Sequence, residues 1–96
     1  MTLVSVERPG TESKVHKDQE MIRTALIAEL DATSLYQAQL DNLDNKEAIR
    51  VIKHIIDEEK EHIAELSCLI MRLDKIQEEK MTEVNPSTCI AGDFQT

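Results

Sequence analysis

The stretch Ile52–Leu66, IKHIIDEEKEHIAEL, decides how this chain folds. Apolar residues return every three or four positions along it, which is the spacing of one face of an α-helix. On a helical projection of 100° per residue centred on Glu59, the stripe comprises Ile52, Ile55, Ile56, His62, Ile63, Leu66, Ile70 and Leu73, all within about 60°. The pattern therefore predicts an amphipathic helix that places a carboxylate, Glu59, and an imidazole, His62, on its apolar face.

A second amphipathic stripe precedes this one. Centred on Glu29, it contains Ile22, Ala25, Leu26, Thr33, Tyr36, Leu40 and Leu43. We expect the first helix to begin at a Thr11 or Ser13 cap and to reach about Leu43. Each predicted helix thus has one apolar face with a glutamate at its centre.

The polar run Asp41–Asn45 separates the two stripes and predicts a turn. Asp44, with Glu47 three residues later, has the spacing of a helix N-cap with its capping-box partner. We therefore expect the second helix to run without a break from about residue 45 to Lys80. Asn85-Pro86 should stop any continuation, because the residue before a proline is disfavoured in helical geometry.

Composition indicates an all-α chain, because the two glycines and two prolines all lie near the termini. We expect a flexible lead-in over 1–10, a helical hairpin over 11–85 and a flexible tail over 86–96. The net charge is −8, from 19 acidic and 11 basic residues. This balance disfavours nucleic acid and anionic membranes as partners. The sequence shows neither a membrane span nor a signal peptide, so we expect a cytoplasmic protein.

The two glutamates should meet at one level of the hairpin. Glu29 lies 15 residues before Asp44, and Glu59 lies 15 residues after it. At a rise of 1.5 Å per residue, both are about 22 Å from the turn. Antiparallel helices would therefore bring Glu29, Glu59 and His62 into one layer.

A hairpin of two helices cannot enclose its own apolar faces. We expect it to dimerise about a two-fold axis into a four-helix bundle, which doubles the layer to four glutamates and two histidines. Four buried carboxylates without counter-charges would be costly. Two divalent ions per dimer would neutralise them.

One Glu on a helix together with Glu-x-x-His on its neighbour is the ligand set of di-iron carboxylate bundles. Carboxylate oxygens suit iron in both oxidation states, and the imidazole adds one ligand per ion. The predicted ligands are Glu29, Glu59 and His62, with two irons per dimer; Zn, Mn or Ca are the other ions that such a site or surface carboxylates could hold. Two alternatives stay open: a non-catalytic metal-binding module, and a helical interaction module whose polar layer sets the register.

Other residues have weaker assignments. Tyr36, two turns beyond Glu29, is either a core side chain or a hydroxyl near the metal. Asp31 is either a solvated carboxylate or part of a site by which metal enters. Cys68 projects about 180° from Glu59, so we exclude it as a ligand. Off-stripe apolar residues indicate a second interface, and hence an assembly larger than a dimer: Ile27, Leu30 and Leu35.

Between about Val15 and Lys80 the chain resembles the encapsulated ferritins, a two-helix branch of the ferritin-like superfamily. The resemblance rests on Ala28-Glu29-Leu30-Asp31 with Tyr36 seven residues after Glu29, and on Glu58-Glu59-Lys60-Glu61-His62. It implies a ferroxidase that oxidises Fe(II) with dioxygen at a di-iron site between two chains, with Glu29, Glu59 and His62 as ligands. It further implies an annular decamer and an encapsulin shell as partner, so that the protein would lie inside a nanocompartment and serve iron storage.

The chain departs from the family pattern at three places. Leu35 stands where members often have a tryptophan, and Ala28 stands where the metal-entering site usually has a second acid. The tail, residues 85–96, has no basic residue, whereas shell-targeting tails usually contain some.

Overall fold

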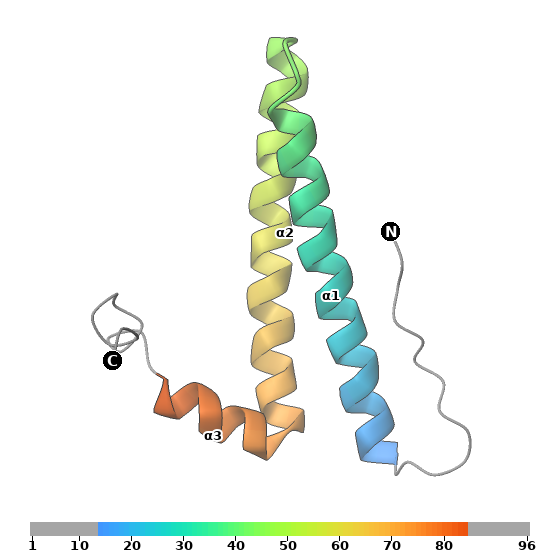
Figure 1. Ribbon diagram of the computed structural model, residues 1–96, viewed down its shortest axis with the longest axis vertical. Helices are drawn as coiled ribbons and strands as arrows, with labels where there is room; N and C mark the ends of the chain where they lie inside the picture. The colour runs from blue at the N-terminus through green and yellow to red at the C-terminus, as the bar shows by residue number, and fades with distance from the viewer. Residues whose placement is uncertain (1–13, 85–96) are drawn as a thin grey trace.

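The computed structural model describes residues 14–84, and in this part of the chain every regular element is a helix. Helix α1 spans Lys14–Leu40, α2 spans Lys46–Leu73 and α3 spans Lys75–Glu83. The predicted hairpin is confirmed, because α1 and α2 run antiparallel beside each other (Figure 1). The expected Thr11 or Ser13 cap and both expected tails lie outside the described residues.

Helices α1 and α2 meet along two rows of side chains spaced alternately three and four residues apart, as in a coiled coil. The row on α2 comprises Ile49, Ile52, Ile56, Glu59, Ile63, Leu66, Ile70 and Leu73. The row on α1 comprises Gln19, Ile22, Leu26, Glu29, Thr33, Tyr36 and Leu40, and Leu43 in the turn continues it. All of these side chains are buried or half-buried, so both glutamates belong to the seam between the helices.

The core of a single chain is thin. Among residues 14–84 only Ile56 and Ile70 are buried, with 4% and 6% of their surface exposed. The rest of the seam is half-buried, because two helices cover each other on one side only. A single hairpin therefore leaves much of its apolar surface in water.

The N-cap of α2 is Asn45, so the prediction of Asp44 was wrong. The side-chain oxygen of Asn45 accepts a hydrogen bond of 2.8 Å from the backbone N–H of Ala48. This bond satisfies one of the donors left free at a helix start. Asp44 lies one residue too early to reach that donor, and Glu47 instead pairs with Arg50.

The predicted unbroken helix to Lys80 was also wrong, because the chain bends at Asp74. Its backbone, at φ −129° and ψ 100°, is extended, and its N–H closes α2 on the carbonyl of Ile70. Its carboxylate then accepts a hydrogen bond of 3.2 Å from the backbone N–H of Gln77, which starts α3. One residue thus ends one helix and caps the next.

Two side chains of α1 hold this bend. Gln19 donates a hydrogen bond of 2.6 Å to the carbonyl of Leu73, and Arg23 forms an ion pair of 2.6 Å with Asp74. The Gln77 N–H and the Arg23 guanidinium hold the pKa of Asp74 below its ordinary value of 3.8. We refer to Gln19, Arg23 and Asp74 as the bend latch.

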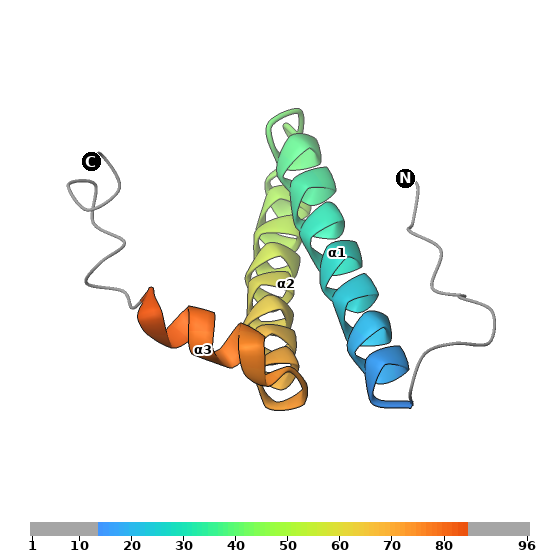
Figure 2. The same ribbon diagram turned by 60° about the horizontal axis from the view of Figure 1, so that its bottom comes forward.

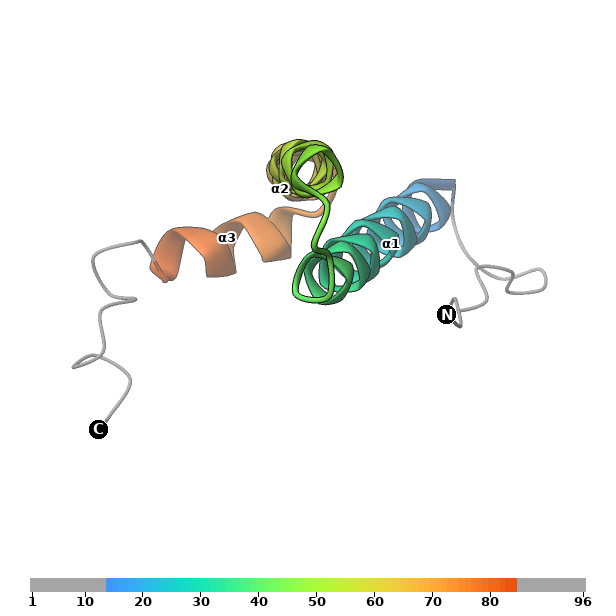
Figure 3. The same cartoon turned by 90° about the horizontal axis from the view of Figure 1, so that it is seen from above.

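The three helices are arranged openly rather than packed side by side along their whole lengths. α1 diverges from α2 towards its N-terminal end, and α3 turns away from the base of α2 (Figure 2). Seen from above, α1 and α3 lie on different sides of α2 (Figure 3). None of the described helices combines the length and the apolar character that crossing a membrane requires.

Candidate metal centre

Glu29, Glu59 and His62 converge in the middle of the hairpin, as the spacing predicted. Each offers one ligand atom, and these atoms lie within 4.8 Å of one another. His62 Nδ1 is 3.5 Å from a Glu29 carboxylate oxygen and 4.0 Å from a Glu59 carboxylate oxygen. Two ligands of one ion with bonds of about 2.1 Å are at most about 4.2 Å apart, so small side-chain rotations would let all three bind one ion.

The helices themselves position these ligands. Glu59 and His62 are three residues apart on α2, which directs them towards the same point. Glu29 reaches that point from α1, because it lies as far before the turn as Glu59 lies after it. Among residues 14–84, Glu29, Glu59 and His62 form a group of three acidic or histidine side chains that lie close enough together to share a metal ion.

The surroundings of one Glu29 oxygen indicate that it binds a metal ion. Glu29 Oε2 is buried and has no hydrogen-bond partner in the described structure. The imidazole nitrogen at 3.5 Å is too distant for a well-formed hydrogen bond. A buried carboxylate oxygen without a donor is costly, and a cation is the species that best compensates it. The residues therefore fit a divalent metal.

The site is open on one side. The Glu59 side chain is 16% exposed and that of Glu29 is 26% exposed, whereas 48% of the His62 side chain is exposed. Three protein ligands leave coordination positions free for water, substrate or a partner's side chain. A single chain therefore supplies too few ligands to fill all the coordination positions of a metal ion.

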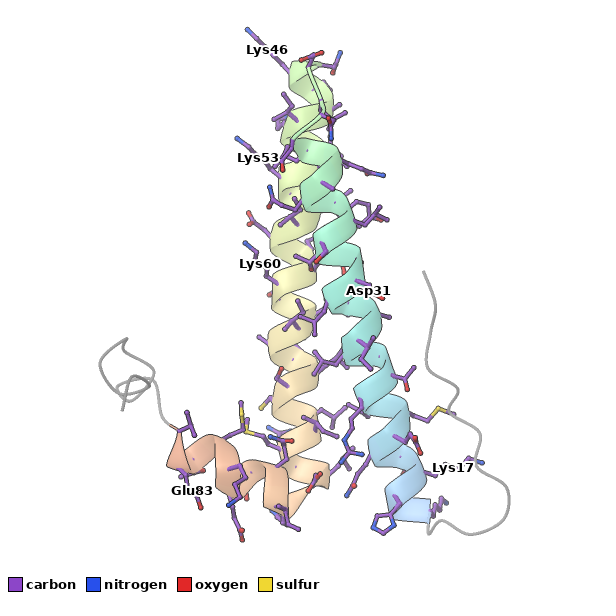
Figure 4. The ribbon with its side chains drawn as sticks, in the orientation of Figure 1. Lys17, Asp31, Lys46, Lys53, Lys60 and Glu83 are labelled. Atoms are coloured by element: carbon purple, nitrogen blue, oxygen red, sulfur yellow. The ribbon has the colours of Figure 1, made fainter. Side chains whose placement is uncertain are left out.

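The other candidate residues lie outside this group. Tyr36 is half-buried in the seam, about 10 Å from Glu29 along the axis of α1. Asp31 is half-buried and lies on α1, where Figure 4 labels it. Cys68 is exposed and is not among the three grouped residues. His54 is exposed, and its Nε2 lies 3.4 Å from a carboxylate oxygen of Glu58.

The acidic side chains of α2 other than Glu59 face solvent. They are Glu47, Asp57, Glu58, Glu61 and Glu65. Three lysines separated by seven residues project from the side of α2 away from α1: Lys46, Lys53 and Lys60 (Figure 4). The charged residues near the centre therefore form a solvated surface, and only Glu29 and Glu59 are drawn into the seam.

This combination of a helical hairpin and a Glu, Glu-x-x-His cluster agrees with comparison to known families. The family described as "Ubiquinone biosynthesis protein COQ7" matches residues 16–87. The chain belongs to this family, within the ferritin-like superfamily. The superfamily is of the di-iron type and includes oxidoreductases, which is consistent with the cluster described above.

Two relatives of this ferritin-like chain are connected with encapsulins. It is 48% identical over 72 residues to "Encapsulin nanocompartment cargo protein EncC" of Myxococcus xanthus, covering 75% of this chain and 53% of that protein. It is 31% identical over 83 residues to "Ferritin-like-encapsulin shell fusion protein" of Pyrococcus furiosus, covering 86% of this chain and 22% of that protein. The chain thus spans about half of the first relative and about a fifth of the second. No solved structure matches it.

Proposed function

We propose that this ferritin-like chain is a ferroxidase, which oxidises Fe(II) to Fe(III) with dioxygen at a di-iron site shared by two chains. The observation that carries the proposal is the convergence of Glu29, Glu59 and His62, with one carboxylate oxygen of Glu29 buried and unpartnered. The membership of a superfamily of di-iron type supports it.

In this proposal Fe(II) is the substrate, and the chain supplies its binding and its charge balance. Glu29 and Glu59 offer hard oxygen ligands that become better partners as the iron charge rises from two to three. Dioxygen accepts the electrons that the iron releases. In a single chain the half-exposed His62 leaves one side of the site open, which is where the second chain would add its ligands.

The small hydrophobic core of a single hairpin is the reason for including a second chain in this proposal. Only two side chains of the described hairpin are buried, and a second hairpin would cover the remaining half-buried seam in a four-helix bundle. A two-fold axis through the metal layer would place four glutamates and two histidines around two ions. Dimers would assemble further into the annular decamer that the resemblance implies, and exposed apolar residues on α1, on α3 and at the C-cap of α3 offer surface for this: Ile27, Leu30, Ile76, Met81 and Val84.

We further propose that the protein acts as cargo of an encapsulin nanocompartment, where it would deliver Fe(III) for storage. The names of both relatives support this role, one a cargo protein and the other a fusion to a shell. Cytoplasmic assembly of such a compartment would place this chain in the cytoplasm, inside the shell.

A non-catalytic metal-binding module is the second candidate, because three ligands in one chain would also hold a structural Zn(II) ion. Anaerobic titration with Fe(II), followed by exposure to oxygen, separates the two functions. A ferroxidase binds two irons per dimer, consumes oxygen and develops Fe(III) absorbance faster than protein-free solution. Metal binding without faster oxygen consumption would contradict the ferroxidase proposal and favour the second candidate.

A further inference from the structure

The hydroxyl groups of the seam lie on one side of the metal layer. In the row on α1, Glu29 is followed by Thr33 and Tyr36, which are half-buried and lie within about 40° of it around the helix. In the opposite direction the row continues with Leu26 and Ile22, which are apolar. The seam is therefore polar from the metal layer towards the hairpin turn, and apolar on the other side of the layer.

A groove lies at the turn end of this polar stretch. It has a volume of about 810 Å³, is open to solvent and has a mainly apolar lining that includes Leu35, Val51 and Ile52. Along α1, Thr33 lies between this groove and the metal layer. It is one helical turn from Glu29, about 6 Å along the axis, and is the nearest hydroxyl to Glu29 in the seam rows.

The hydroxyl hydrogen of Thr33 is committed to the backbone. Thr33 Oγ1 donates a hydrogen bond of 2.9 Å to the carbonyl oxygen of Glu29. A hydroxyl group has one hydrogen and two lone pairs, so Thr33 can still accept hydrogen bonds but has no further hydrogen to donate. Donation to the carbonyl also polarises the hydroxyl oxygen, which makes it a better acceptor.

The carboxylates beside Thr33 are acceptors as well. Glu29 Oε2 is buried and has no hydrogen-bond donor among the described residues. Side chains of a helix are tilted towards its N-terminus, so Thr33 leans back towards Glu29. Glu59 belongs to the antiparallel helix and therefore leans towards the level of Thr33. Both helices thus present oxygen acceptors at this end of the metal layer.

We propose that Thr33 is a positioning residue of the metal layer, and that it holds a water molecule between its hydroxyl oxygen and the carboxylate of Glu29. Side chains four residues apart on a helix have Cβ atoms about 5–6 Å apart, a distance that one water spans with two hydrogen bonds of about 2.8 Å. Because both partners are acceptors, the water donates a hydrogen to each. Its lone pairs are then free to face a cation.

This orientation suits a metal ion held by Glu29, Glu59 and His62. Three protein ligands leave coordination positions of the ion unfilled, and a water molecule with free lone pairs fills one of them. A water that bridges two groups stabilises them nearly as well as a direct hydrogen bond. The inference rests on the metal site of the proposed function and adds to it one residue and one water molecule.

Thr24 provides a matched control within the same helix. Its Oγ1 donates a hydrogen bond of 3.0 Å to the carbonyl of Glu20, also four residues earlier, and Thr24 is half-buried too. The backbone bond is therefore an ordinary feature of threonine in a helix. Thr24 projects about 140° from Glu29 and lies outside the seam row. The position of Thr33, and not its backbone bond, distinguishes it.

Anaerobic binding of Mn(II) to the full-length chain tests the proposal, because Mn(II) prefers carboxylate and water ligands. Thr33→Val removes the hydroxyl with little change in size, Thr33→Ser keeps a hydroxyl, and Thr24→Val removes the same backbone bond away from the seam. We expect Thr33→Val to weaken Mn(II) binding about tenfold, and Thr33→Ser and Thr24→Val to stay within about twofold of the native chain.

Two further measurements distinguish the positioning of water from a structural role. Electron–nuclear double resonance of the bound Mn(II), recorded in H2O and in D2O, detects exchangeable protons of ordered water, and we expect their signal to weaken in Thr33→Val alone. The Tm of the metal-free chain should not fall in Thr33→Val, because valine is apolar and packs against the isoleucine side chains of α2. A fall in Tm without loss of the proton signal would show a structural role instead.

Unchanged Mn(II) binding by Thr33→Val, an equal loss in Thr24→Val, or an equal loss in Thr33→Ser would each overturn the inference. Oxidation of Fe(II) by the native chain tests the proposed function separately. A native chain that oxidises Fe(II) rapidly, with unchanged Mn(II) binding by Thr33→Val, would refute the role of Thr33 and leave the proposed function in place. The expected Mn(II) results in a chain without ferroxidase activity would do the reverse.

Discussion

Glu29 differs from the other carboxylates among residues 14–84 because one of its oxygens is buried without a hydrogen-bond donor. Its Oε2 atom is buried and unpartnered, while the acidic residues on the outer face of α2 are exposed. Two glutamates of identical chemistry can therefore have opposite roles within a few residues: Glu59 lies in the seam and Glu61 in solvent. Substitutions at Glu59 and Glu61 therefore distinguish the loss of a proposed metal ligand from the loss of a surface charge.

We expect Glu59→Ala to lower the rate of Fe(II) oxidation by at least about tenfold, because each substitution removes two ligands from the dimer. Glu61→Ala is the matched control, since it makes the same change of charge two residues away on the exposed face and should keep nearly full activity. Oxygen consumption with Fe(II) measures both. Equal activity of the two variants would remove Glu59 from the proposed site.

His62→Ala should likewise lose at least about tenfold in activity, whereas His54→Ala should not. His54 is an exposed histidine of the same helix, eight residues earlier, and its neighbour is Glu58. Iron content after anaerobic loading provides a second readout. Retention of two tightly bound irons per dimer in His62→Ala would show that the imidazole is not a ligand.

A substitution of Asp31 tests whether this carboxylate binds iron or only attracts it to the protein. Two residues beyond Glu29 on a helix, it is rotated about 200° from that ligand and cannot reach the same ion from the same chain. We expect Asp31→Ala to change the initial oxidation rate by a small, salt-dependent factor, with the iron content unchanged. Loss of bound iron would place Asp31 among the ligands, and an unchanged rate at low salt would leave it as a solvated carboxylate.

The end of α2 is stabilised by contacts with α1, which the helical periodicity of the sequence does not reveal. Asp74 and Gln77 do have the spacing of an N-cap and its N3 partner, and this signal was missed because the apolar stripe continues beyond it. The bend latch then fixes the break, since Gln19 and Arg23 of α1 hold Leu73 and Asp74 in place. The direction of α3 therefore depends on α1, which lies more than 50 residues earlier in the chain.

We predict that Asp74→Ala destabilises α3, whereas Asp74→Asn largely preserves it. Asparagine caps a helix about as well as aspartate, and the half-exposed pair with Arg23 contributes little on its own. Hydrogen exchange of residues 75–83 measures the effect, with the amides of α2 as internal reference. Equal protection of α3 in the two variants would show that the cap does not hold the bend.

Acid should loosen α3 through the same carboxylate. Because the folded pKa of Asp74 is below 3.8, the unfolded carboxyl takes up a proton first as pH falls. The stabilisation is complete above the unfolded pKa and disappears as pH falls through the folded pKa. Exchange protection of α3 should therefore fall below about pH 4 in the native chain, and Asp74→Asn should lack this step.

The single hairpin is marginal by itself, since only Ile56 and Ile70 are buried among its described residues. A shared metal site would couple ion binding to association, because an ion that binds only the dimer stabilises it by mass action. We expect Fe(II) or Zn(II) to shift native mass spectra from monomers towards dimers and larger rings, and a chelator to reverse the shift. Glu59→Ala should lack the response. Spectra that do not change with metal would contradict a site between chains.

The amino-acid sequence by itself determined the helical hairpin and the layer of Glu29, Glu59 and His62. Both follow from local periodicity and from equal distances to the turn, which depend only on helical geometry. The tertiary structure decided how the bend at Asp74 is held, because Gln19 and Arg23 arrive there from α1. It also decided that Glu29 has a buried, unpartnered oxygen and that Leu35 shares a groove with Val51. Burial and shared surfaces depend on how two helices pack against each other, and a helical pattern carries no information about the distance between them.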